Sequence, residues 1–343
     1  MLAIVGACTG GMTPSGDTGG TIADKARLTG AGSTFLGPLM AEWARLYSID
    51  APGVTMDYFP VGSEIGIGRL ITDEVDFAIS EIPLNPKELQ GAGGGEAVIQ
   101  APVAAGAVGL AFNLEGVEAL SLSADVLAAA FSGRITRWND PAIAADNPGR
   151  TLPGTALTPV FRSDPAASTV VFTEYLRRNA KAWPLGVARV VGFPRGLAAS
   201  GSDGVARAVK RTPGAIGYTS AVAARREGSP LAMVANRSGA FVAPGPSGVR
   251  AALDGATGAD EGLALFVPAT LEGPAVYPVV AVSHLVFRVD EDGADAEALG
   301  NFASWILTEG QRSAESVGYF PVPYAIQLRT YEALKARSTK PIR

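Results

Sequence analysis

The sequence predicts an α/β protein of two lobes, and three observations lead to this prediction. The chain has 343 residues, more than one hydrophobic core usually organises, so two domains of roughly 150 residues are expected. Hydrophobic residues make up 47% of the chain and charged residues only 18%, which is typical of compact folded proteins. Short strand patterns alternate with helical patterns, as in a sheet of parallel strands.

The first lobe begins with a short strand, a glycine-rich turn and a helix. Apolar residues at helical spacing predict this helix over residues 38–48. Strand patterns follow at 54–59 and 75–79, separated by a short helix at 67–72. The apolar stretch 100–113 has no helical stripe, so we expect an extended segment that passes from one lobe into the other.

The alternation of strands and helices continues in the second lobe. The predicted helices are 123–131, 140–146, 168–179 and 204–211, and the predicted strands are 157–161 and 215–218. A second long apolar run, 277–289, predicts the return crossing. Two further helices, at about 296–308 and about 323–336, follow it.

These two crossings divide the chain into lobes. We place lobe I at residues 28–105 together with 281–343, and lobe II at residues 106–280. The crossing segments, near 101–109 and 277–283, would contain the hinge about which the lobes close.

Residues 1–27 are predicted to be a truncated lipoprotein signal followed by a flexible tether. Small residues lead into Cys8, as in the segment that precedes a lipid-modified cysteine. No basic residue precedes it, and the apolar part is only about six residues long, shorter than usual. The Gly-, Thr- and Ser-rich stretch 9–23 would be the tether. A chance cysteine near the N-terminus is the alternative.

Composition excludes several classes of function. The chain has 28 Lys and Arg against 33 Asp and Glu, a net charge of -5, and no basic run that would bind nucleic acid. One Cys and one His exclude a disulfide framework and most metal sites, so no cofactor is expected. The longest apolar stretch, about 12 residues at 101–112, is shorter than the roughly 20 that span a bilayer. We expect membrane contact only through the lipid.

A candidate anion site lies where the first strand meets the first helix. In the segment 30–35, glycines permit close approach of a ligand, Ser33 and Thr34 add hydroxyl groups, and the helix start supplies positive potential. On its own this pattern is also typical of an ordinary helix cap. Similar helix starts follow Gly62 and Arg162, so three of them could bind one anion.

Two charged residues point to the kind of anion. Arg162 offers a planar guanidinium that Asp164 would orient, although a surface ion pair is the alternative. Glu81 follows a buried-looking strand and would face the same cleft. A carboxylate beside an anion favours a ligand that still carries a proton, as phosphate does near neutral pH, and disfavours sulfate. An ordinary loop glutamate is the alternative for Glu81.

Several segments together resemble the phosphate-binding protein of the phosphate-specific ABC transporter, the PstS family. These segments are 28–35, 75–84, 131–138, 162–164, 171–176 and 211–218. The resemblance covers nearly the whole chain after the tether and implies a type II periplasmic-binding-protein fold, with two lobes and two crossovers between them. It also implies a monomeric periplasmic or cell-surface protein that captures inorganic phosphate and delivers it to a membrane permease.

The resemblance also implies which residues bind the ligand. Thr34, the backbone amide of Phe35, Ser63 and Arg162 would contact phosphate, and Asp164 would hold Arg162.

This chain departs from the family pattern at two places. Glu81 stands where the family has an aspartate, and residues 165–168 read Pro-Ala-Ala-Ser in place of Gly-Ser-Gly-Thr. Ala166 therefore lacks a hydroxyl, a loss of about 1.5 to 3 kcal/mol for a hydrogen bond to a charged ligand. The expected ligand-binding residues are Ser33, Thr34, Phe35, Ser63, Glu81, Arg162, Ala166, Ala167 and Ser168.

Other ligands and other functions stay open at this point. Arsenate or another protonated oxyanion is the nearest alternative to phosphate. A phosphoester hydrolase would use Ser33 or Ser63 as nucleophile, but the sole histidine, His284, lies in an apolar run that predicts packing, and no G-x-S-x-G elbow is present. A surface lipoprotein that binds nothing has only the substituted loop in its favour. We therefore expect a binding protein and no enzyme.

Overall fold

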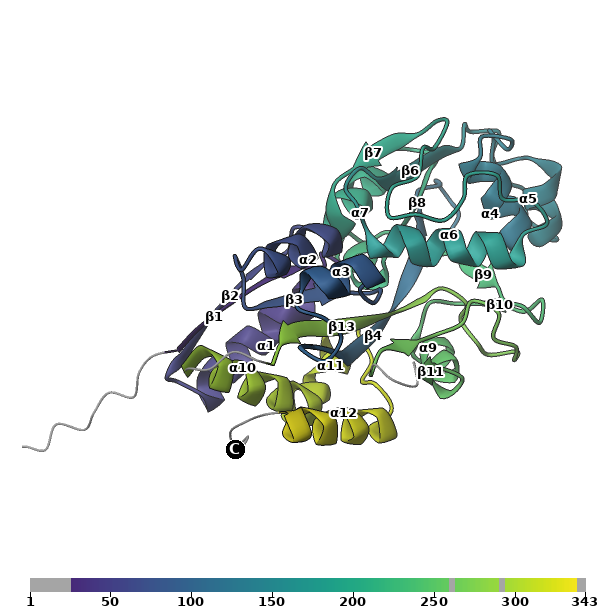
Figure 1. The fold of residues 1–343 in the computed structure, drawn as a ribbon. Helices are drawn as coiled ribbons and strands as arrows, with labels where there is room; N and C mark the ends of the chain where they lie inside the picture. The colour runs from purple at the N-terminus through teal and green to yellow at the C-terminus, as the bar shows by residue number, and fades with distance from the viewer. Residues whose placement is uncertain (1–25, 259–262, 290–293, 338–343) are drawn as a thin grey trace, which may run out of the picture.

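The computed structural model describes residues 26–258, 263–289 and 294–337. It shows two α/β lobes joined through one sheet, with strand order β2-β1-β3-β13-β4-β8-β6-β7 (Figure 1). In this order the strands are β2 (Val54–Phe59), β1 (Ala26–Gly32), β3 (Phe77–Ser80), β13 (Val280–Arg288), β4 (Val98–Phe112), β8 (Ala215–Ser220), β6 (Thr158–Arg162) and β7 (Leu197–Ala199). The predicted α/β class with two lobes is confirmed.

The sheet is mixed, whereas the sequence predicted parallel strands. β1 runs parallel to β2 and β3, and β6 runs parallel to β7 and β8. The two long apolar runs are the exception, because β13 is antiparallel to β3 and β4, and β4 is antiparallel to β8. Parallel strands were expected because two strands joined by a crossover helix run parallel. The apolar run 100–113 forms most of β4, a strand that no such helix connects to its neighbours in the sheet, and the hydrophobic pattern alone does not indicate in which direction those neighbours run.

The strand β4 belongs to the strand groups of both lobes. Its first part pairs with β13 and its last part with β8. β1, β2 and β3 lie on one side of this central pair, and β6 and β7 lie on the other. The lobe boundaries at 105/106 and 280/281 stay a prediction, but the chain does run between the two strand groups through β4.

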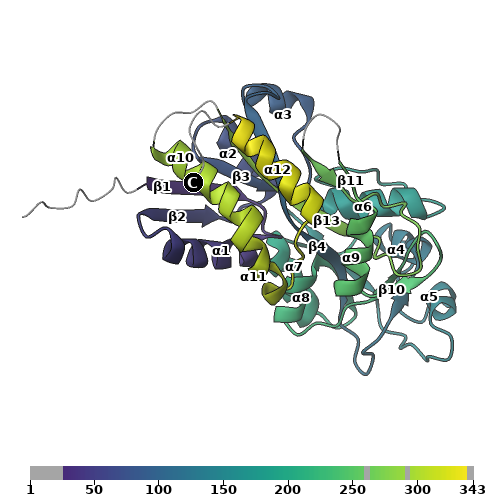
Figure 2. The same cartoon turned by 90° about the horizontal axis from the view of Figure 1, so that it is seen from below.

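Helices cover the sheet in both lobes. They are α1 (Gly37–Asp50), α2 (Ser63–Ile71), α3 (Pro86–Gly91), α4 (Ala124–Phe131), α5 (Pro141–Asp146), α6 (Ala167–Asn179), α7 (Gly201–Arg211), α8 (Ala221–Arg226), α9 (Pro246–Asp254), α10 (Ala294–Trp305), α11 (Gln311–Val317) and α12 (Tyr324–Arg337). Ile306–Gly310 forms a π-helical turn between α10 and α11. Figure 2 shows α10 and α12 side by side beneath the sheet of lobe I, near α1.

Several short elements were not predicted. They are the helices α3, α8, α9 and α11, the edge strand β7, a small sheet of β5 (Ser121–Leu122), β9 (Met233–Ala235) and β10 (Phe241–Val242), and a two-stranded ribbon of β11 (Thr257–Gly258) and β12 (Leu265–Phe266). Each has at most nine residues, too few to give a clear hydrophobic period.

Lobe I is assembled from both ends of the described chain. The helix α1 buries Leu39, Met40, Trp43 and Tyr47, four of the five apolar positions at helical spacing in the predicted helix; the fifth, Leu46, is only half-buried. The indole nitrogen of Trp43 donates a hydrogen bond to the carbonyl of Gly310, 2.9 Å away. This bond ties the first helix of the lobe to the segment that follows the return crossing.

A single glycine sets the position of the first loop. Gly32 has a φ of 135°, and a Cβ at this position would lie 2.3 Å from the carbonyl oxygen of Ile79. Only glycine permits this approach without a shift of the backbone. Ser33 is thereby placed beside the end of β3, where its amide donates to the same carbonyl at 2.9 Å.

Cys8 and its predicted tether lie outside the described residues. Within the described ranges, no helix is both long and apolar enough to cross a membrane. The same ranges contain no group of three or more His, Cys, Asp or Glu that could hold a metal ion.

Candidate functional site

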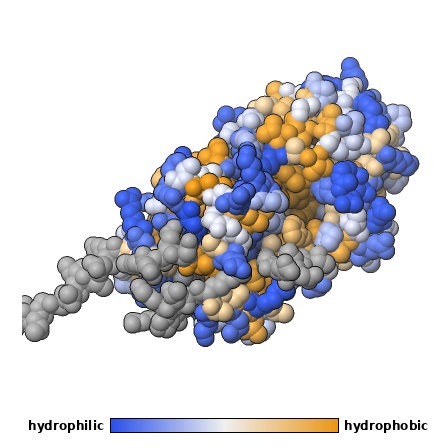
Figure 3. All heavy atoms as spheres, viewed as in Figure 1, coloured by the Kyte–Doolittle hydropathy of each residue, from blue (hydrophilic) through white to orange (hydrophobic). Residues whose placement is uncertain are grey.

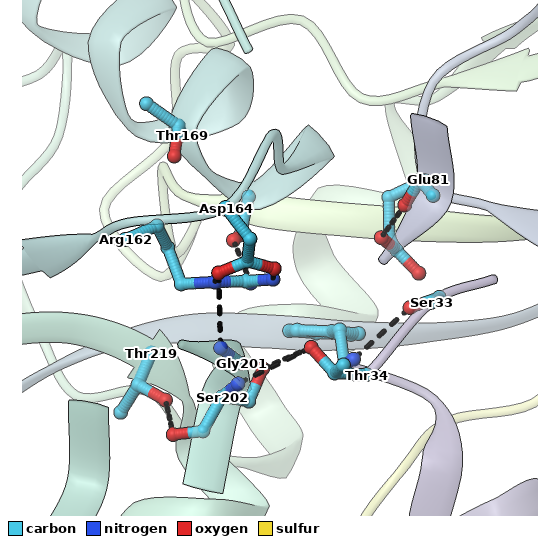
Figure 4. A network of polar contacts seen from close by, with 12 residues as sticks. Ser33, Thr34, Glu81, Arg162, Asp164, Thr169, Gly201, Ser202 and Thr219 are labelled. Atoms are coloured by element: carbon cyan, nitrogen blue, oxygen red, sulfur yellow. Dashed lines mark hydrogen bonds and ion pairs between the residues drawn. The ribbon is translucent and has the colours of Figure 1, made fainter. Parts of the chain in front are cut away.

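The polar residues predicted at three helix starts face one common space between the lobes. Figure 4 shows Arg162 and Asp164 on one side of this space and Glu81 with Ser33 on the other, with Thr34 below. The parallel strands β1, β2 and β3 deliver their carboxyl ends to one edge of the sheet in lobe I, which brings the segments that contain Ser33, Ser63 and Glu81 together. β6 runs in the opposite direction, because three antiparallel pairings separate it from β3, and its carboxyl end brings Arg162 to the same space from lobe II.

Arg162 is held rigidly inside the protein. Its side chain is 3% exposed, and its Nε donates to Oδ1 of Asp164 at 2.8 Å, while Nη2 donates to Oδ2 of the same carboxylate. Its Nη1 donates to the Ser168 hydroxyl oxygen at 3.1 Å. Burial raises the pKa of Asp164, but the hydrogen bonds from Arg162 outweigh it and lower that pKa overall. Asp164 therefore stays ionised and holds the guanidinium in this orientation.

Glu81 lies opposite this ion pair and is itself buried. Ser63 donates to its Oε2 at 3.2 Å, and Ser283 donates to its Oε1 at 3.1 Å. Burial raises the pKa of Glu81, and hydrogen bonds from Ser33, Ser283 and Ser63 oppose that rise only in part. The carboxyl therefore keeps a proton to higher pH than an exposed glutamate, and it can accept a hydrogen bond from a protonated ligand when ionised.

Ser283 is a site residue that the sequence reasoning missed. It lies on β13, inside the apolar run that was interpreted only as a crossing. The polar pair Ser283 and His284 within that run was the available signal. A register shift between these two residues in the pairing of β13 with β4 marks the same place.

The Ser33 side chain closes the turn that leads into α1. Its hydroxyl oxygen accepts from the amides of Phe35 and Leu36, at 3.0 and 3.1 Å, whereas the N-cap residue of α1, Leu36, makes no side-chain cap bond. In this arrangement the amide of Phe35, predicted to contact the ligand, is used by Ser33. The aromatic ring of Phe35 packs edge-on against the ring of Tyr319, with 5.9 Å between the ring centroids.

A fourth helix start joins the site. The helix α7 begins at Gly201, three residues before the predicted start at residue 204. The amide of Gly201 donates to Oδ1 of Asp164 at 3.0 Å, and the amide of the buried Ser202 donates to the Thr34 hydroxyl at 3.2 Å. The second of these bonds joins lobe I to lobe II. The run of small and acidic residues at 200–203 was the signal for this start.

The substituted loop 165–168 enters the helix α6. Ala166 is the N-cap of α6 and has no side-chain cap bond, and its amide donates to the carbonyl of Arg189 at 3.0 Å. Ala167 and Ser168 open the helix, so their amides have no acceptor within it and are available to a ligand. The loop thus offers amide donors but a hydroxyl only at Ser168.

We expect Ala166→Ser to strengthen both the helix and the site. Serine is a preferred N-cap residue, and this gain is about 1 kcal/mol of unfolding free energy. A new hydroxyl facing the ligand should raise phosphate affinity roughly tenfold. Urea unfolding and calorimetry measure the two effects, with Ala167→Ser, one residue past the cap, as the control. A variant no more stable than the Ala167→Ser control would contradict the cap assignment.

Two cavities flank the site, one on each side. A cavity of about 770 Å³ is polar at its inner end, where Thr34, Asp164 and Ser202 line it. A second cavity of about 460 Å³ touches Glu81 and is lined mainly by apolar residues of the segment 265–270, with further valines from α6 and β13. Figure 3 shows the second one as an apolar hollow between the lobes.

Comparisons with known proteins agree with this architecture. A family model described as a PBP superfamily domain matches residues 15–309. The phosphate-binding protein PstS of Xylella fastidiosa is 32% identical over 302 residues, 87% of this chain and 82% of the relative. The phosphate-binding protein PstS 3 of Mycobacterium tuberculosis is 32% identical over 340 residues, 96% of this chain and 91% of the relative.

Solved structures share the fold. A high affinity periplasmic phosphate-binding protein (PfluDING), solved with phosphate bound, has a TM-score of 0.73 at 22% identity and covers 92% of this chain and 100% of its own. A putative phosphate ABC transporter substrate-binding protein from Clostridium perfringens, with bound phosphate, has a TM-score of 0.64 at 18% identity, with 87% and 100% covered. The predicted periplasmic-binding-protein fold is confirmed.

Proposed function

This chain belongs to the PstS family of phosphate-binding proteins within the PBP superfamily, and from this membership we propose how it handles its ligand. It captures inorganic phosphate between its lobes and delivers it to the permease of an ABC transporter. The protein binds its ligand without changing it chemically. The place of action is the periplasm or the cell surface, and Cys8, which lies outside the described residues, would carry a lipid anchor on a monomeric protein.

One observation supports phosphate above other anions. An immobilised cation, Arg162, and a buried carboxyl with a raised pKa, Glu81, face each other across one space. The guanidinium and the helix-start amides donate to the ionised oxygens of the ligand. The carboxylate of Glu81 accepts from the oxygen that still carries a proton. An anion with no proton would meet repulsion at Glu81.

We propose the following division of work among the site residues. Donors to the ionised oxygens are Thr34, Arg162, Ala167 and Ser168, and Glu81 is the acceptor, while Ser33 and Asp164 hold these groups in place. The Ser63 hydroxyl donates to Glu81 in this arrangement and would donate to phosphate in exchange for that bond. The amides of Phe35 and Ala166 have acceptors inside the protein. They would contact phosphate only if they exchange those acceptors for the ligand.

The hydrolase alternative cannot use the sole histidine as its general base. The Nε2 atom of His284 accepts from the amide of Leu265 at 3.0 Å, and Nδ1 lies 3.3 Å from the carbonyl oxygen of Ser80. Burial lowers the pKa of this imidazole to about 4, so it stays neutral with both nitrogens engaged by backbone groups. It is a packed histidine, as predicted, and activates neither Ser33 nor Ser63 in this arrangement.

Calorimetry on the purified protein tests the proposal. We expect heat from phosphate, weaker heat from arsenate, and little from sulfate at neutral pH. At a pH low enough to protonate Glu81, binding of phosphate should weaken because the acceptor is lost. Absence of heat with all three anions would contradict the transport function, and equal affinity for sulfate would contradict the role of Glu81.

A further inference from the structure

Arg189 joins the two lobes through carboxylates that are not among the candidate ligand-binding residues. It lies in the segment 180–196 between α6 and β7, and its side chain is only 15% exposed. Its Nη2 donates to Oε2 of Glu88 on α3 at 3.1 Å, and its Nη1 donates to Oε1 of the same carboxylate. The Nη1 atom also lies 3.7 Å from Oε2 of Glu64 on α2.

The partners of Arg189 belong to the other lobe. The helices α2 and α3 pack with the strand group β1–β3, whereas the segment 180–196 connects α6 to β7 of the second strand group. An ion pair between them can form only when the lobes are together. The two lobes also lie close together at Gly62 of lobe I. A Cβ added to this glycine would lie 3.3 Å from Oδ2 of Asp164 and 3.3 Å from the carbonyl oxygen of Pro165, both in lobe II.

The backbone of Arg189 reaches the anion-binding loop. Its carbonyl accepts the hydrogen bond from the amide of Ala166, the N-cap of α6. Its other partner, Glu64, directly follows Ser63 in the first turn of α2. One residue therefore contacts the starts of two ligand-binding helices, one in each lobe.

The pair has the properties of a specific contact. Both side chains are largely buried, at 15% and 14% exposure, and the two parallel bonds give the geometry in which arginine binds a carboxylate most strongly. Burial raises the pKa of Glu88, but the hydrogen bonds from Arg189 outweigh it and lower that pKa. Glu88 also closes a capping box with Asn85 at the start of α3, so the carboxylate is held in position from its own side.

We propose that Arg189 is a positioning residue that couples closure of the lobes to the shape of the anion-binding loop. When the lobes meet, its guanidinium engages Glu88 and Glu64, and its carbonyl fixes the amide of Ala166 at the start of α6. Opening of the cleft must break this clasp, which we define as Arg189 with Glu88 and Glu64. The clasp therefore controls how long the ligand stays bound, and in this respect the inference rests on the proposed function.

Stopped-flow kinetics with phosphate test the clasp. Arg189→Met removes the charge and keeps the length of the side chain. Because a charged hydrogen-bonded pair is lost from the closed form alone, the dissociation rate should rise about tenfold while the association rate stays within about twofold. Glu88→Gln should act in the same direction, and the double variant should not exceed the larger single effect by much.

A matched control is available in lobe II. Arg178 pairs with Glu174 on the same helix, with Nε 2.7 Å from the carboxylate, so Arg178→Met removes an ion pair that does not cross the cleft. Its dissociation rate should stay at the wild-type value. An unchanged dissociation rate in a folded Arg189→Met protein, or an equal rise in the Arg178→Met control, would overturn the proposal. If Arg189→Met does not fold, Arg189→Lys replaces it, since lysine keeps the charge but loses the paired bonds, with an intermediate rise expected.

Small-angle scattering on the ligand-free protein separates the clasp from the ligand assignment. We expect Arg189→Met to have a larger radius of gyration than the wild type, because fewer molecules are closed. If the wild-type protein bound no phosphate, the proposed function would fail, and the clasp would then be tested by the radius of gyration alone. Identical radii for the wild type and for Arg189→Met would overturn the clasp proposal.

Discussion

Replacement of Arg162 by methionine is expected to abolish measurable phosphate binding and to destabilise the protein. The guanidinium is buried and pairs with Asp164, whose side chain is 13% exposed. Removal of one partner leaves the other charge buried without compensation, at a cost of about 3 to 5 kcal/mol. The ligand also loses its strongest donor, so the affinity should fall by a factor of about a hundred or more. Calorimetry and urea unfolding of the variant measure both effects.

A second substitution separates the two effects of Arg162. Asp164→Asn in the Arg162→Met background removes the uncompensated charge and should recover most of the lost stability. It should not recover phosphate binding. A single Arg162→Met variant that binds phosphate within about tenfold of the wild type would show that the cation is not a ligand contact.

Glu81→Gln should relax the discrimination against sulfate. The amide keeps the size of the side chain but carries no negative charge, so the repulsion of a fully ionised anion disappears. The ratio of phosphate to sulfate affinity should fall roughly tenfold to a hundredfold. Titration of both anions into wild type and variant measures this ratio. Glu115→Gln, at an exposed position, is the control. An unchanged ratio would remove Glu81 from the site.

The same substitution should change how stability depends on pH. Burial raises the pKa of Glu81 above its ordinary value of 4.5, so the folded ligand-free protein binds this proton more tightly than the unfolded chain. Wild-type stability should therefore fall as the pH rises from about 4.5 through the raised pKa and stay lower above it. The Glu81→Gln variant has no carboxyl to ionise at this position, so its stability should not fall in this way, and it should melt at a higher temperature than the wild type at neutral pH. Melting temperatures that show no pH-dependent difference would contradict the burial of an ionisable group.

Much of the architecture could be predicted because short stretches of the sequence show the hydrophobic spacing of a helix or a strand. At α1, α2 and α6 a strand, a turn and the start of a helix follow one another within about ten residues. These patterns located all three helices, although α2 begins at Ser63, before the predicted range of 67–72. The pair Arg162 and Asp164 is separated by only one residue, so its contact followed from spacing. Local sequence was sufficient wherever the interacting groups belong to one turn.

Contacts between distant segments could not be predicted. Ser202 binds Thr34 across 168 positions, and Ser283 binds Glu81 across 202 positions. The hydrogen bond from the amide of Ala166 to the carbonyl of Arg189 could not be predicted either, because no residue pattern in the segment 180–196 indicates that this segment contacts the site. Such contacts depend on how two lobes meet, which a single sequence does not specify.

The charges of the site balance within the protein itself. Arg162 is neutralised by Asp164, and the pKa of Glu81 is raised by burial. The attraction for an anion therefore comes from the N–H groups of Arg162 and from fixed dipoles, the amides and hydroxyls at the helix starts, and not from a surplus of positive charge. Mobile ions screen exposed charges well but buried dipoles poorly. We therefore expect the affinity of a site of this kind to depend only weakly on salt concentration.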